Sequence, residues 1–171
     1  WDEDGGGYFF SPEDANHLIA RTRNAFDNAT PAGNGTMIEN LATLYYLTGN
    51  EIYRDQGELI VDVFARKPST EYINMTSILN GFERLTKTTQ VVIIGEPDAP
   101  ETSMMKAIAS STGHLDLVLS VIQTGRKLPL KHPATGKTQI DGQTTAYVCI
   151  GNVCGPPITA PKELKYTLTE A

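Results

Sequence analysis

The hydrophobic pattern of the chain changes at Gln90, and this change limits the folds that the chain can adopt. Before that residue, apolar side chains recur at helical spacing in three segments of the 171-residue sequence. After it, residues 91–94 form a continuous β-branched run, which is typical of a strand buried on both faces. The sequence therefore predicts a mainly helical part, residues 1–89, with a small α/β segment, residues 90–171, packed on it.

Three amphipathic helices are predicted in the first part. Thr36 and Glu39 have the spacing of a capping box at the start of the first helix, and Gly49 is a stop signal. The second helix is expected over about residues 51–66 and the third over about residues 70–87. Short links between them favour antiparallel neighbours. Ahead of the helices, the N-terminal residues predict a short β-hairpin, or two extended pieces around a turn.

The second part predicts one β-α-β unit. Its strands are the apolar runs 91–94 and 117–122, with a helix over about residues 99–111 between them. Helix N-termini in such units often hold phosphate, but this turn contains three acids and only one glycine. Asp98 and Glu101 are better interpreted as a capping box than as a nucleotide site. A surface loop is expected over residues 127–137.

A β-hairpin with two cysteines is predicted near the end of the chain. Gly151 and Asn152 are a two-residue turn signal, which places Cys149 opposite Cys154. Opposed residues of this kind have Cα atoms about 4.5 Å apart, at the short edge of disulfide geometry. Three states stay open: two reduced thiols, which is the leading interpretation, a labile disulfide, and a zinc site that would need two further ligands.

The candidate functional residues lie in two irregular segments, residues 1–10 and 26–35. Acids, amides, aromatics and glycines gather there, and such segments can present side chains to a ligand. Sugar chemistry uses carboxylates to move protons, and aromatic faces and amides suit a sugar's ring and hydroxyls. The alternative is that Asp and Asn near glycine only stabilise turns. The candidates are Asp2, Glu3 and Asp27 as catalytic carboxylates, and Trp1, Tyr8, Asn28 and Asn34 as ligand-binding residues.

These two segments also carry a resemblance to a known family. Together with residues 44–49, 91–95 and 145–149, they resemble the C-terminal region of the thioredoxin-domain-containing, spermatogenesis-associated-type proteins. The resemblance implies the C-terminal helices of an (α/α)6 toroid, six-hairpin-like and similar to N-acylglucosamine 2-epimerases, with a β-α-β and β-hairpin appendage. Epimerase-like toroids are expected to use histidines, yet His17, His114 and His132 lie outside the segments that carry the resemblance.

The function that this resemblance implies is carbohydrate binding or carbohydrate processing in a fragment of a longer protein. The alternative is a non-catalytic scaffold that accompanies a thioredoxin-like redox domain, and whether the chain is an enzyme stays open. A sugar is the expected ligand, and no cofactor or metal is expected. The apolar surface left by missing toroid helices would be covered by the rest of a longer chain or by a second copy.

Charge and hydropathy exclude two kinds of partner. The net charge is −6 with a pI near 5.0, and the sequence has no basic stripe that could neutralise a nucleic-acid backbone. No apolar run approaches the roughly 18 residues of a membrane-spanning helix, and no signal-peptide pattern is found. The chain is therefore expected to be soluble and cytoplasmic, without nucleic-acid or membrane partners.

Overall fold

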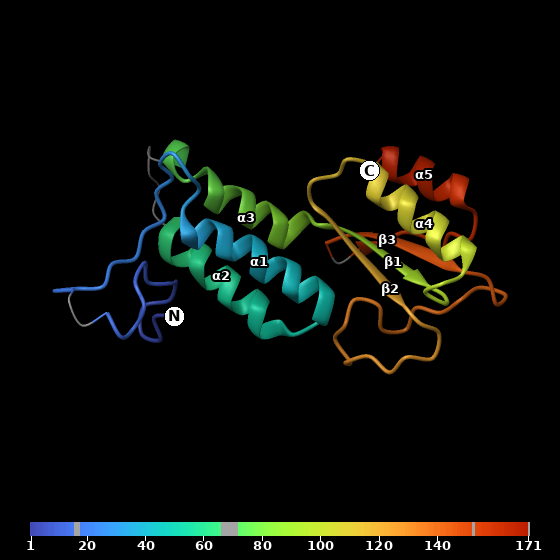
Figure 1. The fold of residues 1–171 in the computed structure, drawn as a ribbon, viewed down its shortest axis with the longest axis horizontal. Helices are drawn as coiled ribbons and strands as arrows, with labels where there is room; N and C mark the ends of the chain where they lie inside the picture. Colours follow the sequence, from blue (N-terminus) through green and yellow to red (C-terminus); the bar gives the residue numbers. More distant parts are fainter. Residues whose placement is uncertain (16–17, 66–71, 152, 171) are drawn as a thin grey trace. The chain divides into compact units, whose positions relative to one another are not determined.

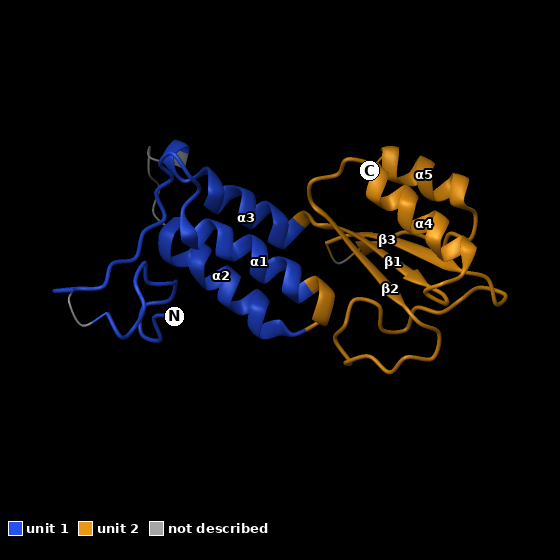
Figure 2. Ribbon diagram, in the orientation of Figure 1, with its two compact units in different colours: residues 1–45, 50–86 blue, residues 46–49, 87–171 orange. Residues whose placement is uncertain are grey.

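The computed structural model describes residues 1–15, 18–65, 72–151 and 153–170, and it divides into two compact units. Unit 1 comprises residues 1–45 and 50–86, and unit 2 comprises residues 46–49 and 87–171 (Figures 1 and 2). Each unit has its own hydrophobic core, so each is described by itself. His17, Asn152 and the predicted helix ends near residues 66 and 70 lie outside the described residues.

Unit 1 is built on three helices, α1 (Gly33–Thr48), α2 (Glu51–Ala65) and α3 (Thr76–Lys87), with the 3₁₀ turn η1 (Tyr72–Asn74) before α3. The last residues of α1 and α3 belong to unit 2. The three helices that the periodicity predicted are thus confirmed. Helices α1 and α3 approach closely at Gly81. A Cβ added to this glycine would lie only 2.6 Å from the Cβ of Ile38. The buried core residues of unit 1 are Ala25, Ile38, Leu41, Ala42, Ile60, Met75, Ile78 and Leu85.

The segment before α1 is irregular. None of the described residues ahead of Gly33 forms a helix or strand, so the predicted N-terminal hairpin is not formed. Its two arms are joined by a backbone hydrogen bond from Phe10 N to Thr22 O at 2.8 Å. Helix α1 begins earlier than predicted, and Thr36 therefore lies inside it with its hydroxyl donating to Ala32 O. The capping box predicted at Thr36 is wrong.

Unit 2 contains a four-stranded mixed sheet in the order β2-β1-β3-β4. Strand β1 (Thr89–Ile94) pairs parallel with β2 (Leu117–Ile122) and antiparallel with β3 (Thr145–Ile150). Helix α4 (Pro100–Ser111) connects β1 to β2, which confirms the predicted β-α-β unit. Strand β4 (Val153–Cys154) pairs antiparallel with β3 and confirms the predicted hairpin.

Helix α4 begins with proline rather than with a side-chain cap. Pro100 occupies the first turn, and the N-cap residue Ala99 makes no side-chain hydrogen bond. Proline suits this position because its missing N–H would have no helical partner there. The capping box predicted from Asp98 and Glu101 is therefore wrong.

Strand β1 is buried along its whole length because both faces of the sheet are covered. Val91 and Ile93 face the core formed with α4 and α5 (Pro161–Glu170). Val92 and Ile94 pack on the opposite side, against Ala134 of the long loop between β2 and β3. A continuous β-branched run is what a strand covered on both faces requires, so this expectation is confirmed.

The predicted fold class, a fragment of an (α/α)6 toroid with an appendage, is wrong. The described residues form an α/β fold, in which unit 2 has its own sheet and core. Local periodicity missed two features that create this core. They are the antiparallel pairing of β1 with β3 and the C-terminal helix α5, whose Leu164 and Leu168 are fully buried. In the part of the chain that the structure describes, no helix is long and apolar enough to cross a membrane.

Candidate functional site

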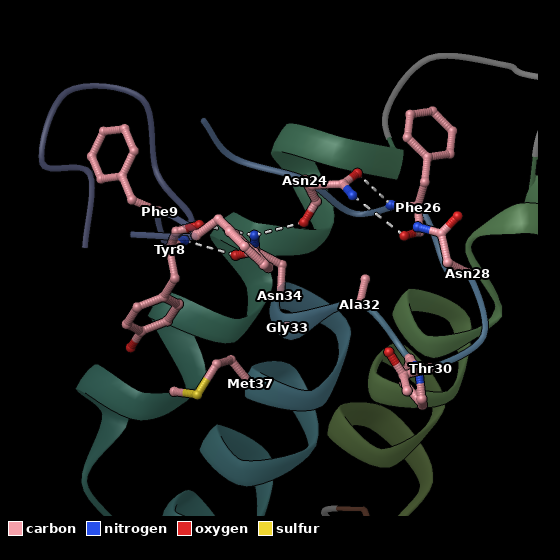
Figure 3. A pocket seen from close by; sticks show the side chains of 12 residues that line it. Tyr8, Phe9, Asn24, Phe26, Asn28, Thr30, Ala32, Gly33, Asn34 and Met37 are labelled. Carbon is pink, nitrogen blue, oxygen red and sulfur yellow. Dashed lines mark hydrogen bonds between the residues drawn. The ribbon is translucent and has the colours of Figure 1, made fainter. Parts of the chain in front are cut away.

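A cavity of about 360 Å³ lies in unit 1 beside the first turn of α1 (Figure 3). Aromatic rings, amides and small side chains line it, and none of the described residues in its lining is charged. The lining residues are Tyr8, Phe9, Phe10, Asn24, Phe26, Asn28, Thr30, Pro31, Ala32, Gly33, Asn34 and Met37. Three of the predicted ligand-binding residues, Tyr8, Asn28 and Asn34, are therefore brought to one cavity.

Asn34 is a structural clamp in the wall of this cavity. Its Oδ1 accepts a hydrogen bond from Tyr8 N at 2.7 Å, and its Nδ2 donates to Tyr8 O at 3.0 Å and to Asn24 O at 2.9 Å (Figure 3). The residue is only 3% exposed. Both amide protons are used by the protein, so Asn34 has no donor left for a ligand hydroxyl.

Asp27 is not among the lining residues of the cavity, and it joins the starts of two helices. Its Oδ1 accepts from Ala32 N at 2.8 Å and from Ser77 Oγ at 2.5 Å, and its Oδ2 accepts from Thr76 Oγ1 and Ser77 N, both at 2.8 Å. Ala32 directly precedes α1, and Thr76 and Ser77 open α3. A carboxylate in this position satisfies amide groups that a helix start leaves free, and it is favoured by the helix dipole.

These hydrogen bonds change the acidity of Asp27. Burial acts to raise its pKa, but the bonds from Ser77, Ala32 and Thr76 outweigh that effect and lower the pKa to about 2. A general acid or base works best with a pKa near the operating pH. Asp27 is therefore held as a permanent anion with its oxygens occupied, which suits a structural role better than proton transfer.

Asp2 likewise stabilises local structure. Its Oδ1 accepts from Asp4 N and Gly5 N, both at 3.2 Å, and its Oδ2 lies 2.9 Å from Arg23 Nη1. Arg23 also donates to the carbonyl of Gly6. Gly6 and Gly7 have φ values of +69° and +83°, which explains the glycine run as a tight turn.

Glu3 and Trp1 lie at a second cavity of unit 1, of about 600 Å³, which also contains Glu13 and Arg21. Glu3 is the only one of the three predicted catalytic carboxylates that lines either of these two cavities. Trp1 packs edge-on against Tyr8, with ring centroids 5.1 Å apart, and burial raises the pKa of the Tyr8 phenol. Asp2, Glu3 and Asp27 therefore do not meet in one cavity.

Asn28 and two neighbours that sequence reasoning missed offer free groups to the first cavity. The side-chain amide of Asn28 and the hydroxyl of Thr30 have no hydrogen-bond partner among the described residues, and both are exposed. Phe26, which also lines this cavity, is 43% exposed. Phe26 and Thr30 belong to the same glycine-rich segment as Asn28, so their position next to it was the available signal.

The two cysteines form a disulfide between β3 and β4. The structure therefore contains the bridge rather than the reduced thiols that the sequence favoured, and the predicted opposition of Cys149 and Cys154 is confirmed. Cys149 is 2% exposed, whereas Cys154 is exposed. No group of three or more His, Cys, Asp or Glu side chains that could hold a metal occurs among the described residues.

Alkylation should report this bridge and the unequal exposure of its two sulfurs. In the native protein without reductant, we expect neither cysteine to be labelled by iodoacetamide. After mild reduction, Cys154 should react faster than Cys149, because the thiol of Cys149 is buried. Peptide mass spectrometry gives both results, and full labelling of the unreduced native protein would show that the bridge is absent.

The remaining histidines make structural contacts. His114 Nε2 lies 2.5 Å from Leu168 O, and His132 Nε2 lies 3.0 Å from Leu47 O, each within unit 2. Neither histidine lines the cavity beside α1. No described histidine therefore supplies an acid or base to that cavity.

Comparison with known proteins relates the chain to a longer protein. No family profile matches it. It is 27% identical over 176 residues to spermatogenesis-associated protein 20 of Homo sapiens, 26% identical over 176 residues to that of Rattus norvegicus, and 27% identical over 178 residues to that of Mus musculus. Each comparison covers 98% of this chain but 22% of the relative. The chain is thus homologous to about a fifth of spermatogenesis-associated protein 20.

Proposed function

We propose that unit 1 binds a neutral carbohydrate in the cavity beside the first turn of α1, without catalysis by Asp2 or Asp27. The observation that carries this proposal is the composition of the cavity wall. It combines the exposed side chain of Phe26 with the free side-chain amide of Asn28 and the free hydroxyl of Thr30, and none of its described lining residues is charged. An apolar face with a few polar groups suits a neutral ring with hydroxyls.

Among the described residues, the predicted catalytic carboxylates do not converge on this cavity, which favours binding over turnover. Glycoside chemistry uses a pair of carboxyl groups about 5–10 Å apart across the scissile bond. Asp27 is saturated by four hydrogen bonds, and Asp2 is paired with Arg23. Glu3 lines only the second cavity, so it is the carboxylate to replace in any test for activity.

Thermal unfolding against a panel of neutral and N-acylated sugars tests the proposal. A ligand that binds only the folded protein stabilises it by about 2.7 kcal/mol at a hundredfold excess over its dissociation constant. We expect at least one sugar to raise the Tm, Phe26→Ala and Asn28→Ala to remove the shift, and Glu3→Gln to leave it. Asn80→Ala is the matched control, because Asn80 is exposed on α3 and does not line the cavity.

A scaffold that docks another polypeptide segment is the second candidate, and exposed apolar side chains on unit 1 favour it. Ile52 is 60% exposed, Phe82 is 49% exposed and Leu79 is 44% exposed. If no sugar shifts the Tm, carbohydrate binding is rejected. Sedimentation of the chain then tests the scaffold. The scaffold predicts that the chain associates with itself, and that Leu79→Ser and Phe82→Ser reduce this association.

A further inference from the structure

A third cavity lies in unit 2, at the ends of the two parallel strands. Its volume is about 180 Å³, and Ile94 and Ile122, the last residues of β1 and β2, form part of its wall. The rest of the wall comes from the loop that follows β2. Ligands of open α/β sheets bind beyond the carboxyl ends of parallel strands, so this position is one where a site is expected.

The loop that closes this cavity is basic. Residues 123–139 contain four lysine or arginine side chains and no carboxylate, in a chain whose net charge is −6. Arg126 and Lys137 both line the cavity. Neither forms an ion pair with a carboxylate among the described residues.

Lys137 is held in place by the protein. Its Nζ donates to Pro133 O at 2.6 Å and lies 5.7 Å from the centroid of the Tyr147 ring. The side chain is half-buried, and this burial lowers the pKa of its ammonium group. A cation that is partly removed from water and not paired with an acid is stabilised when an anion binds beside it.

Hydrogen bonds within the loop fix its shape around the cavity. His132 accepts from Ala134 N at Nδ1, and its Nε2 faces Leu47 O, so the buried imidazole anchors the loop. Thr124 Oγ1 donates to Gln139 Oε1, which joins the two arms of the loop. Glu96 accepts from Gln123 Nε2 at 3.0 Å, but Glu96 itself does not line the cavity.

We propose that this cavity binds the phosphoryl group of a small molecule, with Arg126 and Lys137 as its cationic ligands. Arginine and lysine are the side chains that proteins use for phosphate, arginine through paired N–H donors and lysine as a point charge. Because about 180 Å³ lies below the roughly 300 Å³ at which pockets for drug-sized ligands begin, the phosphorylated molecule is small. The acidic turn before α4, residues 95–99, argues against phosphate binding at the start of that helix. This turn has no part in the proposed site.

Calorimetric titration of the whole chain with inorganic phosphate and with glycerol 3-phosphate, at constant ionic strength, tests this site. We expect saturable binding of at least one of them and none of glycerol. Tighter binding of glycerol 3-phosphate identifies a phosphorylated small molecule as the ligand, and equal binding identifies the phosphoryl group alone. Arg126→Gln and Lys137→Gln should each weaken binding about tenfold or more, since each removes a charged hydrogen-bond donor.

Lys127→Gln is the matched control, because it removes the same charge from the same loop at an exposed residue that does not line the cavity. It should retain binding. An equal loss in Lys127→Gln would mean general attraction to the basic loop, and no binding of either anion would also overturn the site. If Lys137→Gln unfolds the loop, Arg126→Gln still decides, since the Arg126 side chain has no partner among the described residues.

Discussion

Replacing Asn34 by aspartate is expected to destabilise unit 1 by about 3 kcal/mol, the range for breaking a buried hydrogen-bond network. The substitution keeps the acceptor for Tyr8 N but puts a second carboxylate oxygen against the carbonyls of Tyr8 and Asn24. Those carbonyls then lose their donor in a site that is 3% exposed. The helix dipole favours an acid in the first turn of α1 and would by itself make the substitution stabilising. A measured loss of stability would therefore come from the broken hydrogen bonds.

Urea unfolding measures this change, with Asn28→Asp as the matched control. The control makes the same chemical change at an exposed residue whose side-chain amide has no partner among the described residues. We expect its effect to lie within about 0.5 kcal/mol. Equal stability of Asn34→Asp and Asn28→Asp would contradict the clamp.

Replacing Asp27 by asparagine is expected to cost about 2–3 kcal/mol at neutral pH. Asparagine has one acceptor oxygen where aspartate has two, and its NH₂ group must then face the hydroxyls and amides that donate to Asp27. Both α1 and α3 lose a partner at their starts. Asp4→Asn is the control, because Asp4 is exposed and its carboxylate has no partner among the described residues.

The effect of Asp27 on stability should depend on pH in a defined direction. Its pKa in the folded protein, about 2, lies below the ordinary value of 3.8, so the folded state favours the anion. The stabilisation is fully present above about pH 4 and is lost as the pH falls through about 2. The difference in urea midpoint between the wild type and Asp27→Asn should therefore shrink over that interval. A difference independent of pH would falsify the assignment of the anion.

Local sequence patterns were sufficient for the elements that depend on neighbouring residues. The β-branched run of β1 and the Gly151 turn signal predicted a buried strand and a hairpin, and both are present. The pairing of β1 with β3 was not predictable in this way, since Ile94 and Thr145 meet only through the tertiary fold. The helices of unit 1 were predicted, but their placement in a toroid was an inference from the resemblance and is wrong.

The candidate site was predicted in location more than in role. Segments rich in acids, amides and glycines suggested chemistry, and three of the residues do line one cavity. The roles of Asp27 and Asn34 depend on partners that no local pattern reveals. Ser77 is 50 positions from Asp27, and Tyr8 is 26 positions from Asn34. The same residue types that bind a sugar also fasten irregular backbone to helices, and only the tertiary contacts distinguish these uses.

The central position of β1 has a consequence for the synthesis of the chain. Its six buried residues leave the ribosome well before β3, which begins at Thr145 and covers one of its edges. Until then an apolar strand has an open hydrogen-bonding edge, the feature through which chains aggregate. Slow translation of the stretch between β2 and β3 would lengthen this exposure. The long loop that shapes the anion cavity therefore also sets how long the edge of β1 stays unpaired and open to a chaperone.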